Sequence, residues 1–118
     1  MFDFNLDPLQ LLVTLVLFHF LLDFAIQGDF VAQNKGRKHL NGNPNPNWYI
    51  ILTAHSAVHA LPVWILTDSY LGLVIVFITH FLIDFTKCEG KLTFLQDQML
   101  HIIVLLVTVL ILTSKYSF

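Results

Sequence analysis

Two related stretches decide the fold of this chain: FHFLLDF at residues 18–24 and THFLIDF at residues 79–85. Each places a histidine and an aspartate four residues apart, about one turn of a helix, in a segment apolar enough to lie in a bilayer. Ionisable side chains are costly in a membrane helix, so their presence there points to a functional site. The two stretches therefore predict membrane-spanning helices that carry polar groups on one face.

The composition of the whole chain agrees with a membrane protein. Of its 118 residues 56% are hydrophobic and 12% are charged, and the mean hydropathy is +0.71. These values exceed what a small soluble domain uses for its core. The formal net charge is −2, and no basic stripe indicates nucleic-acid binding. The single cysteine, Cys88, excludes an internal disulfide.

Four apolar segments follow one another along the chain. Short connections make successive segments antiparallel. The predicted fold is therefore all-α: one integral-membrane domain over residues 1–118, built as a four-helix antiparallel transmembrane bundle. The expected helices are residues 8–27, 48–67, 70–86 and 94–113, with a polar loop over residues 28–47.

The basic residues predict the orientation in the membrane. Five of the six Lys and Arg residues fall in the connections after the first and third segments, at Lys35, Arg37, Lys38, Lys87 and Lys91. The opposite side carries Lys115, together with Asp3, Asp7 and Asp68. By the positive-inside rule, both termini face outside and both basic loops face the cytoplasm.

Every predicted helix carries one pair of ionisable groups four residues apart. The pairs are His19 and Asp23, His55 and His59, His80 and Asp84, and Asp97 and His101. At a rise of about 1.5 Å per residue, all eight groups lie roughly 3 to 17 Å into the membrane from the basic side. Facing imidazoles and carboxylates suit zinc, iron or manganese, and eight groups exceed the needs of one tetrahedral zinc ion. We therefore expect one or two divalent ions, with zinc preferred, held by these eight residues.

The pairs also fit two roles that involve no bound metal. A hydrogen bond to a neighbouring helix accounts for any single pair, and a proton or ion pathway is the alternative for the whole set. A pathway needs polar groups along the whole membrane normal. The half of the predicted bundle away from the basic side is almost bare of them, which favours a closed site.

Several more polar side chains are predicted to serve this site. Gln27, Gln98 and Thr53 would orient its ligands or line it, or else join neighbouring helices. Lys87 and Lys35 would bind an anionic head group, or else extend to the membrane interface. Asp84 and Asp97 are the candidate catalytic acid–base residues.

The repeated stretch also indicates that two helical hairpins arose by duplication. The first two segments and the last two run in the same order and carry related motifs, as in parallel repeats about an axis along the membrane normal. Chance use of Phe and Leu is the alternative.

The combined motifs resemble the domain-of-unknown-function family 3307, small integral membrane proteins of bacteria and phages. The resemblance rests on HFLLDF at residues 19–24 with Gln27, Asn34-Lys35, His55 with His59, HFLID at residues 80–84 with Lys87, and Asp97-Gln98 with His101. It implies a location in the bacterial inner (cytoplasmic) membrane, but it indicates almost nothing about the activity of the protein. Residues 53–56, TAHS, with the His/Asp pairs, are more loosely similar to membrane-bound metal-dependent hydrolases.

The sequence leads to three functional hypotheses. The first is a metal-dependent hydrolase acting on a lipid or amphipathic phosphate or ester at the cytoplasmic leaflet, because a bound metal ion activates water and polarises the attacked bond. The second is a non-enzymatic membrane metal carrier, sensor or scaffold, and the third is a di-iron redox enzyme. The expected partners are the bilayer and an amphipathic substrate, and nucleic acid is not expected. Assembly into a homo-oligomer stays open.

Overall fold

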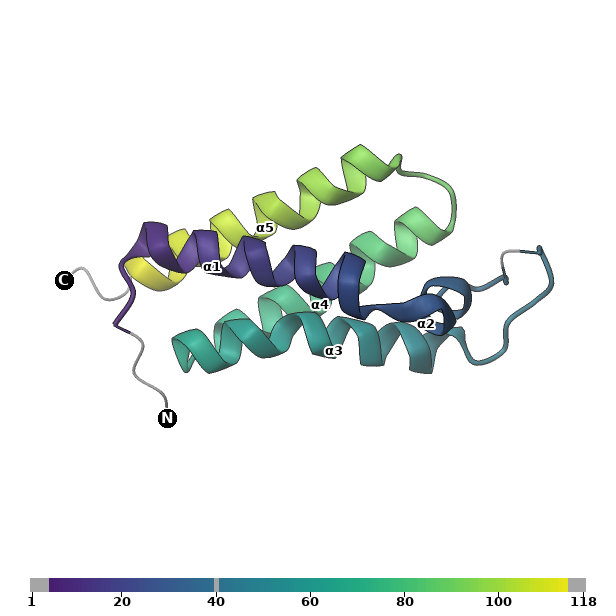
Figure 1. The fold of residues 1–118 in the computed structure, drawn as a ribbon, viewed down its shortest axis with the longest axis horizontal. Helices are drawn as coiled ribbons and strands as arrows, with labels where there is room; N and C mark the ends of the chain where they lie inside the picture. The colour runs from purple at the N-terminus through teal and green to yellow at the C-terminus, as the bar shows by residue number, and fades with distance from the viewer. Residues whose placement is uncertain (1–4, 40, 115–118) are drawn as a thin grey trace.

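Four long apolar helices run side by side in the computed structural model, which describes residues 5–39 and 41–114 (Figure 1). Within these residues, the helices long and apolar enough to cross a membrane are Pro8–Ile26, Trp48–Thr67, Tyr70–Cys88 and Phe94–Ser114. The predicted all-α class and the bundle of four apolar helices are confirmed. Asp3 and Lys115, which entered the prediction of orientation, lie outside the described residues.

The first span contains two kinds of helix. α1 (Pro8–Phe20) begins with Pro8 in its first turn and with a capping box, in which Asp7 accepts from the Gln10 backbone N–H at 2.8 Å and Gln10 accepts from the Asp7 N–H at 3.1 Å. It continues as the π-helix η1 (Leu21–Ile26), which contains the buried Asp23. Wide π turns of this kind are frequent at functional sites. The sequence pattern did not predict it.

The polar connection after the first span is more ordered than a simple loop. It contains the short helix α2 (Gly28–Asn34), and an isolated β-bridge joins Lys38 to Pro44. The connection lies at the end of the bundle opposite the start of α1 (Figure 1). The second basic connection, which joins the last two spans, lies at this same end (Figure 1).

The remaining spans are α3 (Trp48–Thr67), α4 (Tyr70–Cys88) and α5 (Phe94–Ser114). α3 is followed by Asp68, which has the left-handed conformation with φ of 53°. The Ser69 hydroxyl then caps α4 by accepting from the Gly72 N–H at 3.1 Å. These two residues make the tight turn that sets α3 and α4 antiparallel, and these helices share the most extensive contact in the bundle.

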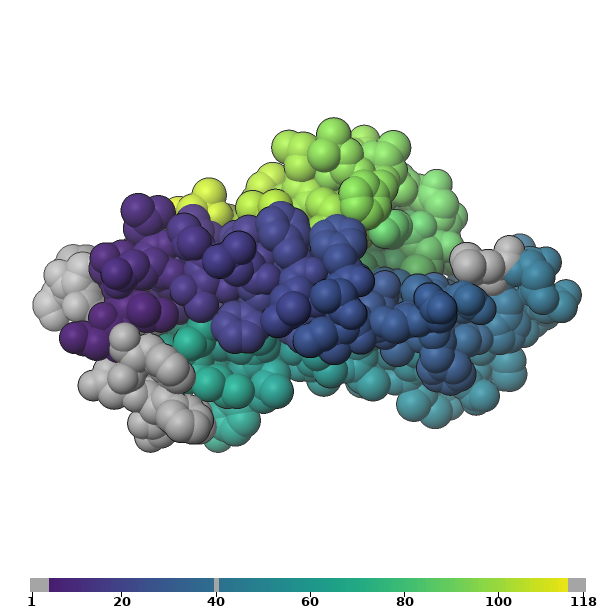
Figure 2. Space-filling view, viewed as in Figure 1, coloured from purple at the N-terminus to yellow at the C-terminus, as the bar shows by residue number. Residues whose placement is uncertain are grey.

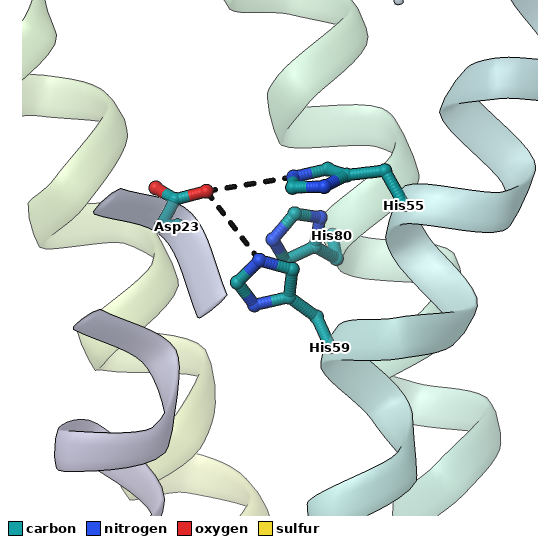
Figure 3. A group of neighbouring side chains, drawn as sticks. All are labelled: Asp23, His55, His59 and His80. Atoms are coloured by element: carbon teal, nitrogen blue, oxygen red, sulfur yellow. Dashed lines mark ion pairs between the residues drawn. The ribbon is translucent and has the colours of Figure 1, made fainter. Parts of the chain in front are cut away.

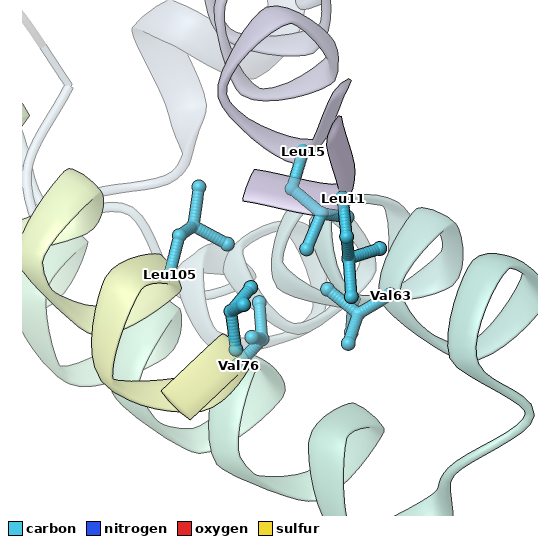
Figure 4. Packing of buried hydrophobic residues seen from close by; sticks show 7 residues of the cluster. Leu11, Leu15, Val63, Val76 and Leu105 are labelled. Atoms are coloured by element: carbon cyan, nitrogen blue, oxygen red, sulfur yellow. The ribbon is translucent and has the colours of Figure 1, made fainter. Parts of the chain in front are cut away.

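An apolar core fills the half of the bundle nearer the start of α1. Figure 4 shows its side chains packed against one another. Its buried members come from all four spans: Leu11, Leu15, Ala60, Val63, Val76, Leu105 and Val109. Gly72 permits a close approach here, since a methyl group at its position would stand 2.9 Å from both Leu112 and Val63. Large apolar side chains such as Leu9, Phe24 and Leu110 instead face outward, as a lipid-facing surface requires. In Figure 2, α1, coloured purple, covers the face of the bundle between α3 and α5.

Candidate metal centre

The half of the bundle nearer the basic connections has a polar interior. The structure brings all eight predicted ligands into it, and each is at most 8% exposed. The two copies of the repeated stretch face each other across this interior, with the ring centres of His19 and His80 6.1 Å apart. The i, i+4 spacing on each helix is what turns both members of each pair inward.

Four of these residues form the first group, to which we give the name histidine group: Asp23, His55, His59 and His80. One ligand atom from each lies within 4.8 Å of the others. The Nε2 atoms of His55 and His59 each lie 3.4 Å from Oδ1 of Asp23 (Figure 3). The His80 ring stacks on His59 with 3.9 Å between ring centres. Helices α3 and α4 thus supply the imidazoles, and the π-helix η1 supplies the carboxylate.

Every member of the histidine group has a buried polar atom that lacks a hydrogen-bond partner among the described residues. These atoms are Oδ1 of Asp23, Nε2 of His55, Nε2 of His59 and both ring nitrogens of His80. Leaving one such atom buried and unpaired costs about 1–3 kcal/mol. An ion bound between them would supply the missing partner for atoms of all four residues, so the donor set fits a metal ion.

Three residues form the second group, the carboxylate group: Asp84, Asp97 and His101. Their ligand atoms also lie within 4.8 Å of one another. His101 Nε2 donates to Oδ1 of Asp84 at 3.2 Å and lies 3.4 Å from Oδ1 of Asp97. The two groups adjoin, because His55 Nε2 lies 3.2 Å from Oδ2 of Asp84. A further set of His19, His80 and His101 could also surround an ion.

Gln98 joins the helices around Asp23. Its amide nitrogen donates to Oδ2 of Asp23 at 2.8 Å and to Oδ2 of Asp97 at 3.0 Å. Its amide oxygen therefore faces His19, whose Nε2 donates to it at 2.9 Å. Gln98 thus orients the Asp23 carboxylate, and His19 holds the Gln98 amide in place.

Lys35 enters the centre from outside the spans. It is only 7% exposed, and its ammonium donates to Oδ2 of Asp84 at 2.9 Å and to the Gln27 side-chain oxygen at 2.7 Å. Burial acts to lower the pKa of Lys35, but the Asp84 carboxylate outweighs it, so the pKa lies above its ordinary value. Lys35 is thus a charged ion-pair partner inside the centre, where it would reach a substrate only by leaving Asp84.

Lys87 lies at the rim of the centre, and Thr53 lies outside it. The Lys87 ammonium lies at the rim, about one-third exposed, 3.6 Å from Oδ2 of Asp97. Thr53 is exposed and lines a surface pocket with Phe77 and Phe81, so the structure does not bring it to the centre. Gln27 donates to the Asp23 backbone carbonyl at 3.4 Å as well as accepting from Lys35.

One supporting residue, Asn45, had no signal in the sequence beyond its place in an Asn- and Pro-rich run. It is 4% exposed, and its amide donates to the backbone carbonyls of Asn34 and Gly36. These carbonyls flank Lys35, so Asn45 fixes the backbone on both sides of the buried lysine.

A small cavity of about 20 Å³ adjoins the histidine group, toward the apolar core. His19, His59, His80 and His101 line it on the polar side, and Leu15, Val76 and Leu105 are among its apolar lining. A space of this size holds one water molecule, and the imidazoles supply polar contacts for it.

The fold and this interior define a class: a four-span membrane protein with buried clusters of histidine and aspartate that could hold a metal ion. The chain belongs to the family described as protein of unknown function (DUF3307), which matches residues 11–118. The predicted resemblance to that family is confirmed. No curated protein and no solved structure matches the chain, and the comparisons give no support to the looser similarity to membrane-bound hydrolases.

Proposed function

We propose that this chain is an integral-membrane metal-binding protein whose ion is held by the histidine group. The observation that carries the proposal is the set of buried atoms without a hydrogen bond, at least one on each member of that group, in the part of the chain that the structure describes. Polar interiors are normally satisfied by hydrogen bonds, so a convergent set of unpaired donors and acceptors calls for a ligand. A divalent cation matches three imidazoles and one carboxylate.

Zinc is the proposed ion. Three histidines and one aspartate give the four nitrogen and oxygen ligands of a tetrahedral zinc site. His19 and Gln98 would orient the Asp23 ligand from behind, as outer partners of metal ligands do. The remaining predicted ligands, His101, Asp84 and Asp97, lie beside this set.

We propose hydrolysis as the reaction, because the cavity beside His59 and His80 can hold a water molecule. A zinc ion held by the histidine group would need to take this water as a fifth ligand, and it would then lower the pKa of the water toward neutrality. Asp84 is the first candidate to accept its proton, since it lies 3.2 Å from His55 of the ligand group, and Asp97 is the second.

A lipid or other amphipathic molecule is the proposed substrate class. A groove of about 430 Å³ between the first span and α3 is almost entirely apolar, with Leu22, Leu61 and Ile65 among its walls. Phe18 and Pro62 line both this groove and the small cavity at the histidines. A hydrocarbon chain in the groove would therefore end beside the proposed ion.

Metal content tests the binding proposal. The protein is purified in mild detergent, supplied with zinc, desalted and analysed for metal per chain. We expect about one ion in wild type and in His39→Ala, whose histidine lies in the polar connection, and far less in His59→Ala. Wild-type protein that retains no zinc would contradict the proposal.

Turnover tests the reaction separately. Zinc-loaded and zinc-free proteins are compared on a phosphomonoester lipid and a carboxylic ester lipid in mixed micelles. Zinc-dependent release of phosphate or fatty acid supports hydrolysis, and its loss in Asp84→Asn supports the acid–base role. Bound zinc without release from either lipid would favour the carrier, sensor or scaffold alternative.

The proposed orientation places both basic connections in the cytoplasm of a bacterial inner membrane. Cysteine labelling tests it with Arg37→Cys in a Cys88→Ser background, since Arg37 is more than half exposed. We expect an impermeant thiol reagent added to intact cells to leave this cysteine unlabelled and to label it after permeabilisation. Ready labelling in intact cells would reverse the orientation.

A further inference from the structure

We propose that the carboxylate group is a second cation position and that the ammonium of Lys35 is its resident cation. The proposal rests on the proposed metal site in the histidine group and deepens it, because it sets the number of metal ions that the centre holds. It predicts one divalent ion per chain in the natural protein, and a second divalent ion in the carboxylate group once the lysine is removed.

The two groups differ in how their carboxylates are satisfied. Oδ2 of Asp84 accepts from Lys35 at 2.9 Å, and Oδ1 of Asp84 accepts from His101 at 3.2 Å. Oδ1 of Asp23, in contrast, has no hydrogen-bond partner within residues 5–39 and 41–114. The Lys35 ammonium thus already pairs with Asp84, whereas Oδ1 of Asp23 is available to bind a metal ion.

The position of Lys35 is built into the fold. Its side chain is more than nine-tenths buried, which is costly for an ammonium unless it is paired. Gln27 supplies a second acceptor at 2.7 Å, and Asn45 holds the backbone carbonyls on both sides of the lysine. Such anchoring distinguishes Lys35 from a surface lysine that folds over a carboxylate by chance.

The donor set of the carboxylate group is otherwise that of a metal site. Asp97 is fully buried, and its Oδ1 has no hydrogen-bond partner among the residues described. Two carboxylates and one imidazole within 4.8 Å of one another are ligands of the kind that zinc, manganese or iron accepts. Without Lys35, Oδ2 of Asp84 would also be available.

Charge opposes a second divalent ion while the lysines are in place. Lys35 and Lys87 pair with Asp84 and Asp97 and so balance two of the three buried carboxylates. With neutral imidazoles, one divalent ion then leaves the centre with a charge of about plus one, and two ions would leave about plus three. With Lys35 removed, two divalent ions leave a charge of about plus two, and with both lysines removed they leave about plus one. Uncompensated charge inside a membrane protein is costly, so the lysines favour a single ion.

Metal stoichiometry tests the inference on the full-length protein in detergent, loaded with excess zinc and desalted. We expect about one ion per chain in wild type and about two in Lys35→Met, which keeps the length of the side chain and removes its charge. The matched control Lys38→Met, an exposed lysine of the same connection, should stay at one. Lys35→Met/Asp97→Asn should return to one, because the second ion loses a ligand.

The outcomes separate this inference from the proposed function. Wild type with no zinc contradicts the proposed metal site itself. Wild type with two ions, or Lys35→Met with one, overturns the second cation position and leaves the first site standing. Lys87→Met is the control at the rim. Because the Lys35 ammonium still occupies the second position in this variant, we expect the count to stay at one, and a second ion would overturn the inference.

A measurement on unaltered protein keeps the inference testable if the variants do not fold. Lysines are methylated with formaldehyde and a reductant, with and without zinc, and the modified positions are found by mass spectrometry. We expect exposed Lys38 and Lys91 to react and Lys35 to be protected in both states, because zinc and the ammonium occupy different positions. Zinc-induced reactivity of Lys35 would show that the ion displaces it and would overturn the inference.

Discussion

The two halves of this bundle use the same four helices to build opposite interiors. One half packs apolar side chains such as Leu15, Val63 and Leu105 against one another. The other half buries the eight histidines and aspartates, and its polar atoms are only partly satisfied by one another. Val76 and His80 show the change within a single turn of α4.

The two halves of the bundle contribute differently to its stability. In a membrane, close van der Waals packing between helices stabilises the bundle, and the apolar half supplies it. Buried polar groups without partners cost free energy, so stability does not account for the polar half. A ligand that pairs those groups does account for it, and the two halves should therefore respond to substitution in opposite ways.

The largest effect is expected at His80, whose ring nitrogens both lack hydrogen-bond partners in the described part of the chain. His80→Leu removes a proposed metal ligand, and we expect zinc affinity to fall by more than about 100-fold, beyond the roughly 10–100-fold that loss of an outer partner costs. The metal-free protein should keep its thermal midpoint or gain from the change, because an unsatisfied polar group is replaced by an apolar one. Zinc titration and thermal denaturation in detergent measure the two effects. Unchanged zinc affinity would remove His80 from the site.

A smaller effect is expected at Gln98, which orients Asp23 and contacts His19. Gln98→Met keeps the approximate volume and removes the hydrogen bonds, so zinc affinity should fall roughly 10–100-fold with the stoichiometry unchanged. Gln33→Met, on the exposed surface of α2, is the matched control and should bind zinc as wild type does. Equal affinities in the two variants would deny Gln98 its orienting role.

The smallest effect on the centre is expected from the apolar half. Gly72→Ala places a methyl group 2.9 Å from Leu112 and Val63, and we expect it to cost about 1–3 kcal/mol of stability while zinc affinity stays unchanged. Ala57→Val, which adds volume at an exposed position of α3, should change neither. The thermal midpoint and a zinc titration, measured together, check this. A large loss of zinc affinity in Gly72→Ala would show that the two halves are not separable.

Much of this arrangement could be predicted from the helical spacing of the polar pairs and from the free-energy cost of placing ionisable side chains in a membrane helix. Long apolar segments require helices that satisfy their own backbone groups in a bilayer. The i, i+4 spacing of pairs such as His19 and Asp23 puts both side chains on one face, and the alternating helix directions put the pairs in one layer. The structure accordingly gathers all eight predicted residues in one interior.

Contacts that depend on irregular backbone could not be predicted in this way. Lys35 follows the short helix α2, inside a segment expected to be a loop. Its ammonium reaches Asp84 while a hydrogen bond from Asn45 to the Gly36 carbonyl holds the adjoining backbone. The π-helix around Asp23 likewise has no sequence signature among its Leu, Phe and Ala neighbours. Thr53 illustrates the converse, because its sequence neighbourhood near His55 placed it at the site, whereas the helical period turns it outward.

X-ray absorption spectroscopy at the zinc edge tests the central claim most directly. On zinc-loaded wild-type protein, we predict a first shell of nitrogen and oxygen atoms at about 2.0–2.1 Å, with the scattering pattern of several imidazoles, and loss of part of that pattern in His59→Ala. A shell of oxygen atoms alone, or a sulfur ligand at about 2.3 Å from Cys88, would contradict a zinc centre built by Asp23, His55, His59 and His80.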